Sequence, residues 1–173
     1  MAANVEIKAR VNDLDSMREV VERVADRPGE PILQRDVFFH TPRGRLKLRV
    51  LGPEAGQLVY YERQDNEGPR RSDYLIAPTP DPSSLERVLG ACLGVRGVVS
   101  KERWLYWVGN TRIHLDHVEG LGEFLELEVV LEPGQPAEEG AQRARELMER
   151  LGIGDADLIG VAYMDLLERH GGC

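Results

Sequence analysis

Charged residues occupy every second position in several segments of this 173-residue chain. Glu6 and Lys8 alternate near the N-terminus, and Glu126 and Glu128 alternate in the last third of the sequence. Further alternating sets are Arg45, Lys47 and Arg49; Tyr61 and Arg63; Arg71 and Asp73; Lys101 and Arg103; and Arg112, His114 and Asp116. Successive side chains of a strand point to opposite faces, so each segment would carry these side chains on one face. Grouped cations suit phosphate oxygens, and paired carboxylates suit Mg²⁺ or Mn²⁺. Taken alone, the Glu126 and Glu128 pair fits salt bridges with neighbouring arginines better than a metal site.

Two interpretations of these charged faces are open. An antiparallel sheet commonly exposes one polar face to water, and for a single strand this is the simpler interpretation. If the sheet closes into a barrel whose apolar face packs outward on helices, the charged faces line an interior channel instead. Buried charge without a partner is costly, so a channel with this many cations requires a polyanionic ligand. The segregation of carboxylates at 126–128 from cations at 45–49 and 101–103 favours the channel.

Hydrophobic periodicity and turn residues predict the elements that would position these side chains. Period-two patterns predict strands at residues 4–11, 32–40, 45–51, 57–63, 71–76, 95–108, 111–118 and 121–131. Helical spacing predicts helices at 13–25, 83–93, 137–151 and 158–170, the first capped by Asn12 or Asp13. About eight short strands interrupted by helices favour an α+β fold. We expect a closed antiparallel β-barrel with a tunnel and with peripheral helices on its outer face, rather than an open sandwich.

The composition restricts the class of protein. With 42% hydrophobic and 30% charged residues, the chain is typical of a folded protein, and its length fits one domain. A formal net charge of −8 argues against binding to a nucleic-acid duplex. No segment is apolar enough to span a bilayer, so no membrane partner is expected. With only Cys92 and Cys173, the chain has no disulfide framework, and we expect a reducing, cytoplasmic compartment.

The order and spacing of the motifs resemble the CYTH superfamily of triphosphate tunnel metalloenzymes, which includes class IV adenylate cyclases and thiamine triphosphatases. The motifs that carry the resemblance are Asn4-Val5-Glu6-Ile7-Lys8-Ala9-Arg10, Phe38-Phe39, Leu46-Lys47-Leu48-Arg49, Lys101-Glu102-Arg103, Ile113-His114-Leu115-Asp116, Gly122 to Glu128, and Tyr163. They extend over nearly the whole chain, which implies a single CYTH-like domain at residues 1–173. Asn4 stands where the family's E-x-E-x-K motif has its first glutamate, and this removes one carboxylate.

The resemblance also implies roles for individual residues. The expected ligands of Mg²⁺ or Mn²⁺ are Glu6, Glu126 and Glu128, with Asp116 assisting. The expected phosphate-binding residues are Lys8, Lys47, Arg49, Arg63, Arg71, Lys101 and Arg103. The expected catalytic residues are Glu6, Lys8, Glu126 and Glu128.

The implied function is that of a divalent-metal-dependent enzyme acting on a small-molecule triphosphate: a nucleoside triphosphate, thiamine triphosphate or tripolyphosphate. Hydrolysis by water at the terminal phosphorus is favoured, because it needs neither a base pocket nor a positioned ribose. One alternative is a class IV adenylate cyclase, in which the ribose 3′-hydroxyl attacks the α-phosphorus and pyrophosphate leaves. The other is a noncatalytic module that binds polyphosphate or nucleotide. For His114 a packed position in the barrel is favoured over a general-base role. The sequence leaves both a monomer and a homodimer open.

Overall fold

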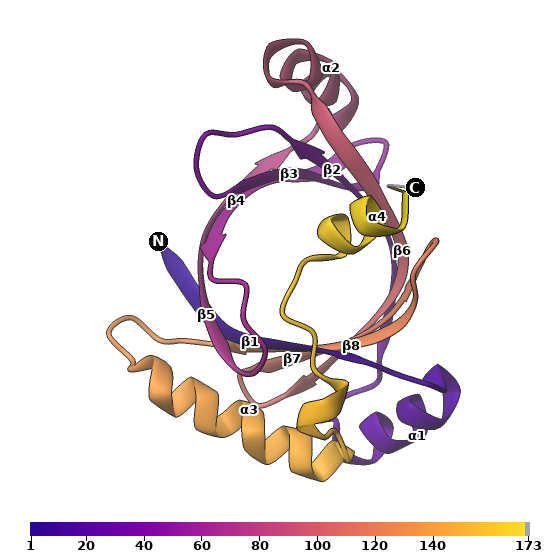
Figure 1. Cartoon of the computed structure of the whole chain (residues 1–173), viewed down its shortest axis with the longest axis vertical. Coiled ribbons are helices and arrows are strands. Elements are labelled where there is room, and N and C mark those ends of the chain that lie inside the picture. Colours follow the sequence, from indigo (N-terminus) through magenta and orange to yellow (C-terminus); the bar gives the residue numbers. More distant parts are fainter. Residues whose placement is uncertain (172–173) are drawn as a thin grey trace.

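The strands of the chain form one closed antiparallel barrel in the computed structural model, which describes residues 1–171 (Figure 1). The strands are β1 (Ala2–Arg10), β2 (Glu30–Phe39), β3 (Arg45–Gly52), β4 (Ala55–Arg63), β5 (Arg70–Thr79), β6 (Val95–Val108), β7 (Thr111–Val118) and β8 (Gly122–Val130). Their order around the ring is β1-β5-β4-β3-β2-β6-β7-β8, and every neighbouring pair is antiparallel. The predicted α+β fold with a closed barrel is confirmed.

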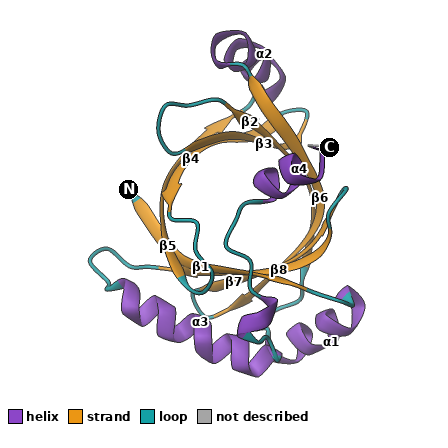
Figure 2. Ribbon diagram, in the orientation of Figure 1, coloured by secondary structure: helices purple, strands orange, loops and turns teal. Residues whose placement is uncertain are grey.

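Three helices cover the outer wall of the barrel (Figure 2). They are α1 (Leu14–Val24) on β6 and β7, α2 (Pro82–Leu93) on β2, β3 and β4, and α3 (Ala137–Leu151) on β1 and β8. The largest apolar cluster joins Ile7 and Leu127 of the strands to Val21 of α1 and Leu147 of α3. Because this wall buries its apolar side chains outward, the charged faces of the same strands point inward. None of the helices described has the length and apolar character that spanning a bilayer requires.

The C-terminal segment differs from the single helix predicted at residues 158–170. A short 3-10 turn occupies Asp155–Asp157, and α4 begins only at Tyr163 and extends to Gly171. Between them Leu158 bridges to Ala9 of β1. The prediction that this helix covers the outer face is wrong, because α4 lies across one end of the barrel (Figure 1). Its apolar side chains pack on inward-facing residues there, among them Phe38, Val99 and Phe124.

Candidate functional site

The inward faces of the strands enclose a cavity of about 360 Å³, a volume typical of small-molecule sites. Seven basic and four acidic side chains line it: Lys8, Lys47, Arg49, Arg63, Lys101, Arg103 and Arg112, with Glu6, Asp36, Glu126 and Glu128. Most of the residues that the sequence assigned to a shared interior are therefore together in one cavity. The interior carries more basic than acidic groups, as a binding site for a polyanion would.

Candidate metal ligands meet where β1, β8 and β7 run side by side. The strand register places Glu6 opposite Glu128, and it places both Lys8 and His114 opposite Glu126. One ligand atom each from His114, Glu126 and Glu128 lies within 4.8 Å of the others. Neighbouring carboxylates repel one another unless a cation lies between them. Two carboxylates and an imidazole are a donor set that fits a divalent ion.

The two central carboxylates are ionised. Burial alone would raise the pKa of Glu128, but His114 and Arg112 lower that pKa to about 2. Burial has the same effect on Glu126, and there Lys8 and Arg103 hold the pKa well below its usual range. Burial, reinforced by Arg103, lowers the pKa of His114. At neutral pH the cluster of His114, Glu126 and Glu128 therefore presents two negative carboxylates.

Glu6 pairs with two arginines and not with His114, Glu126 or Glu128. Its carboxylate accepts a hydrogen bond from Arg63, and Arg70 Nε lies 3.6 Å from its Oε1. Glu6 still lines the cavity beside Glu128, its partner on β8. The structure therefore brings Glu6 to the edge of the cluster of His114, Glu126 and Glu128.

Asp116 does not face the cavity with the other carboxylates. Its two oxygens accept hydrogen bonds of 2.6 Å from Nε and Nη2 of Arg103, the residue directly opposite on β6. The Tyr163 hydroxyl donates to Oδ2 at 2.9 Å, and Lys101 Nζ lies 3.5 Å from it. Three of these four contacts fall on Oδ2, and Asp116 is not part of the cavity lining. Asp116 therefore holds Arg103 and Lys101 in place. The structure does not put it in the cavity lining, where we expected it to assist in binding the metal.

Several buried arginine donors have no acceptor within residues 1–171. They are Nε of Arg49, Nε of Arg63, and both Nε and Nη2 of Arg70. Leaving a buried donor unsatisfied costs about 1–3 kcal/mol, so these groups require an acceptor that the chain does not supply. Charged donors at close spacing are suited to phosphate oxygens.

Two lysines that line the cavity, Lys8 and Lys47, also have too little negative charge beside them. Burial lowers the pKa of Lys8 to about 7, although Glu126 raises it. Burial lowers the pKa of Lys47 to about 8, although Asp36 raises it. Lys8 Nζ also donates to the Val161 carbonyl at 3.2 Å. A bound polyanion would favour the charged form of both lysines.

Asp36 lines the cavity, although its position in the sequence does not predict this. It accepts hydrogen bonds from Lys47 Nζ at 2.8 Å and from Gln34 Nε2 at 3.0 Å, and it lies 3.6 Å from Arg49 Nε. Burial raises the pKa of Asp36, but Lys47 and Arg49 more than offset this and hold it below its usual range. Arg35, next to it, points outward and pairs with a glutamate of α2. Since both faces of β2 carry polar residues, alternation alone could not identify the inward face.

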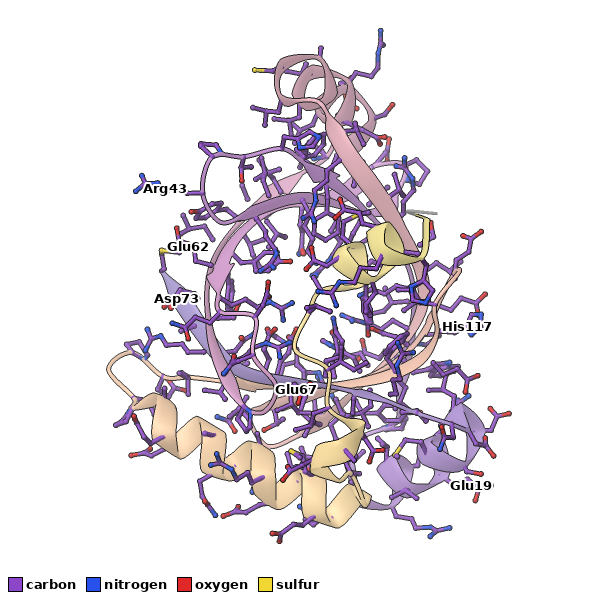
Figure 3. All side chains as sticks on the ribbon, in the orientation of Figure 1. Glu19, Arg43, Glu62, Glu67, Asp73 and His117 are labelled. Atoms are coloured by element: carbon purple, nitrogen blue, oxygen red, sulfur yellow. The ribbon has the colours of Figure 1, made fainter. Side chains whose placement is uncertain are left out.

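The inward face of β5 is offset by one residue from the expected face. Arg71 is exposed and donates to Asp73 at 2.8 Å, and Asp73 lies outside the barrel wall in Figure 3. Arg70 and Ser72 face inward instead, opposite Glu6 and Asn4 of β1. The structure does not bring Arg71 to the other phosphate-binding candidates. Two consecutive arginines start this strand, so the charge pattern fits either register.

The two ends of the cavity differ. At one end α4 closes the barrel: Tyr163 lines the cavity, and Asp165 accepts a hydrogen bond from Arg96 of β6 at 2.6 Å. Toward the other end the lining includes four aliphatic side chains, Ile32, Leu51, Ile76 and Leu105. Leu51 and Ile76 are 41% and 45% exposed, so this end meets solvent.

A closed barrel of eight antiparallel strands with cations and carboxylates in its interior defines a tunnel-fold protein. A model of the CYTH domain matches residues 2–163, and the chain belongs to the CYTH family. Adenylate cyclase CyaB of Aeromonas hydrophila is 28% identical over 175 residues, which cover 95% of this chain and 88% of that protein. The resemblance inferred from the motifs is confirmed.

Solved structures share the fold. The PH1012 protein of Pyrococcus horikoshii OT3 has a TM-score of 0.84 and 27% identity, covering 94% of this chain and 98% of that one. The Hippeastrum protein HpAC1, for which a dominant triphosphatase activity is described, has a TM-score of 0.63 and 17% identity, with coverage of 99% and 96%. At that identity the likeness to HpAC1 shows the fold alone.

Proposed function

We propose that this protein binds a small-molecule triphosphate together with a divalent metal ion inside the barrel and hydrolyses the triphosphate. The observation that carries the proposal is that the unsatisfied Nε donors of Arg49 and Arg63 share one cavity with two ionised carboxylates. The donors match phosphate oxygens, and the carboxylates match the metal that accompanies a triphosphate.

The residues divide into two groups by task. Glu126 and Glu128 would hold the ion, with Glu6 beside them. A bound Mg²⁺ or Mn²⁺ supplies positive charge to the phosphate oxygens and polarises the phosphorus–oxygen bond. The basic group would bind the nonbridging oxygens; its members are Lys8, Lys47, Arg49, Arg63, Lys101 and Arg103. Hydrolysis then depends on cations fixed where negative charge develops and on water held in line with the terminal phosphorus.

The aliphatic side chains at the open end of the cavity support an organic triphosphate over inorganic tripolyphosphate. Side chains such as Leu51 and Ile76 offer no partner to a phosphate, but they pack well against an organic group. The phosphates would occupy the charged interior, and the organic group would lie toward solvent.

A second candidate, the adenylate cyclase, is supported by the likeness to CyaB. In that reaction the ribose 3′-hydroxyl attacks the α-phosphorus, and the same cations would bind the leaving pyrophosphate. A noncatalytic binding module is the third candidate. It is supported by Asn4, whose buried Oδ1 lacks a hydrogen-bond partner in the described chain and supplies no carboxylate to a metal.

Product analysis separates the three candidates. Purified protein is incubated with ATP, thiamine triphosphate or tripolyphosphate, each with Mg²⁺ or Mn²⁺. Release of inorganic phosphate supports hydrolysis, cyclic AMP with pyrophosphate identifies a cyclase, and binding without turnover identifies the module. Glu126→Gln and Glu128→Gln should reduce metal-dependent turnover by more than the 10- to 100-fold typical of lost second-shell contacts. Glu102→Gln, on the outer face of β6, is the matched control and should retain full turnover.

A further inference from the structure

His114 differs from the other histidines of the chain in its surroundings. The chain has four histidines, and His40, His117 and His170 are exposed. His114 is only 5% exposed, and it lines the cavity. Its Nδ1 has no hydrogen-bond partner among residues 1–171. A buried ring nitrogen without a partner is costly, so a group outside the chain is expected to satisfy it.

Two carboxylate oxygens lie at distances from His114 Nδ1 that suit a shared ion. Nδ1 is 3.7 Å from Glu126 Oε2 and 3.9 Å from Glu128 Oε1. Both separations are too long for a hydrogen bond. Two ligands that each lie about 2.1 Å from one ion are at most about 4.2 Å apart, so both separations fit a common ion.

The oxygens that face His114 retain capacity for a metal. Arg112 donates to Oε2 of Glu128 at 2.8 Å. The other oxygen of Glu128, Oε1, faces the imidazole of His114. Arg103 Nη2 donates to Oε2 of Glu126 at 2.8 Å. An ionised carboxylate has about four lone-pair sites, so this oxygen can accept from Arg103 and also ligate an ion.

We propose that His114 is a protein ligand of the divalent ion held by Glu126 and Glu128, and that its nitrogen makes the site prefer transition metals such as Mn²⁺ and Co²⁺ to Mg²⁺. The inference rests on the proposed function, because it specifies the metal of that site. Mg²⁺ favours oxygen ligands and dehydrates reluctantly. Imidazole strengthens binding of first-row transition metals, in an order that rises from Mn²⁺ to Co²⁺.

The direct test is electron spin-echo envelope modulation of the whole protein loaded with Mn²⁺ alone, without any triphosphate. Wild-type protein should show modulation from a coordinated imidazole nitrogen, and His114→Gln should lack it. The matched control is His117→Gln, on the same strand but outside the barrel wall in Figure 3, and it should keep the signal. By calorimetry, His114→Gln should weaken Co²⁺ binding on the order of tenfold or more and leave Mg²⁺ binding within about threefold.

Labelling with ¹⁵N-histidine provides a version of the test that needs no substitution. The wild-type modulation should change from the ¹⁴N to the ¹⁵N pattern. The proposal is overturned if wild-type protein binds no Mn²⁺, if bound Mn²⁺ gives no nitrogen modulation, or if the modulation persists in folded His114→Gln. A nitrogen signal without turnover of any triphosphate would reject the proposed function and leave the metal assignment intact. Turnover without the nitrogen signal would support the proposed function and reject His114 as a metal ligand.

Discussion

At the residue scale, buried charges inside the barrel fall into two groups according to whether the chain supplies their partners. Asp116 satisfies Arg103 and fixes its orientation through two short hydrogen bonds. Arg49 and Arg63 keep buried donors that no residue in the described chain satisfies. The first group is held in place before a ligand arrives, and the second has capacity for that ligand. Fixed donors of this kind stabilise negative charge without reorganising when the charge appears.

Removing a free donor should weaken triphosphate binding. We expect Arg49→Ala to cost about 1.5–3 kcal/mol, which is roughly a 10- to 150-fold increase in Kd, because it removes charge-assisted hydrogen bonds. Calorimetric titration with a non-hydrolysable triphosphate analogue measures the effect. Arg71→Ala is the matched control, since Arg71 lies on the outer face of β5, and its Kd should not change. Equal losses in both variants would mean that the analogue binds outside the cavity.

Ligand binding should also be linked to protonation of Lys47, whose pKa is lowered to about 8. At pH 9 this lysine is largely neutral in the free protein, and a polyanion favours its charged form. Binding of ATP without metal should therefore take up protons in calorimetry with buffers of different ionisation enthalpy, on the order of one at Lys47 and up to about one more at Lys8, whose pKa is lowered to about 7. Lys47→Arg keeps the charge but does not titrate, so it should bind ATP with smaller uptake. Proton release, or the same uptake in Lys47→Arg, would contradict this account.

Lys47 also makes the free energy of unfolding of the free protein depend on pH in a known direction. Between about pH 8 and the ordinary lysine pKa of 10.5, the unfolded chain binds a proton at Lys47 that the folded protein does not. The contribution of Lys47 to the free energy of unfolding therefore rises with pH across this window. A bound polyanion removes this dependence, because it restores the proton in the folded state.

At the scale of elements, alternation in the sequence located the strands and most of their inward faces. β3 and β6 were predicted well because each carries cations on one face and mostly apolar residues on the other. The pattern failed for β2, where Arg35 and Asp36 make both faces polar, and for β5, where Arg70 and Arg71 are adjacent. In both strands the inward face is decided by neighbouring strands. Arg70 faces Glu6, and Asp36 faces Arg49.

The C-terminal helix was placed wrongly for a different reason. An apolar stripe shows that a helix packs against something, but not against which surface. In the structure, Met164 of α4 packs over Gly97 of β6, where any side chain would collide with it. Asp165 accepts hydrogen bonds from Arg96 and from Arg45, two residues far away in the sequence. These long-range contacts determine that α4 closes the barrel.

The position of α4 should depend on Asp165. Asp165→Asn removes the charge that pairs with Arg96 and Arg45, and we expect a loss of about 1–3 kcal/mol in the free energy of unfolding. Urea denaturation followed by fluorescence measures this loss. Glu168→Gln is the control, because Glu168 contacts Arg96 from an exposed position and should cost less than about 1 kcal/mol. If Asp165→Asn is as stable as Glu168→Gln, the contacts of Asp165 do not anchor the helix.

At the scale of the whole molecule, closure of the barrel decides whether the charged faces of the strands meet water or line a cavity. β1 pairs with β5 on one side and with β8 on the other, and these pairings convert a polar sheet face into a cavity lining. Alternation within one strand is the same for a sheet exposed to water and for a closed barrel. The fold was therefore predictable from the number of strands and the motifs together. The detailed partners of Asp116 and His114 were not, because they depend on the register between strands.

The most direct test of the central claim is a crystal structure of the protein with Mn²⁺ and a non-hydrolysable triphosphate analogue, with anomalous scattering used to locate the metal. The account predicts phosphates inside the barrel in contact with Lys47, Arg49 and Lys101, and an anomalous peak beside Glu126 and Glu128. An analogue bound only to the outer surface, with solvent alone in the barrel, would contradict it.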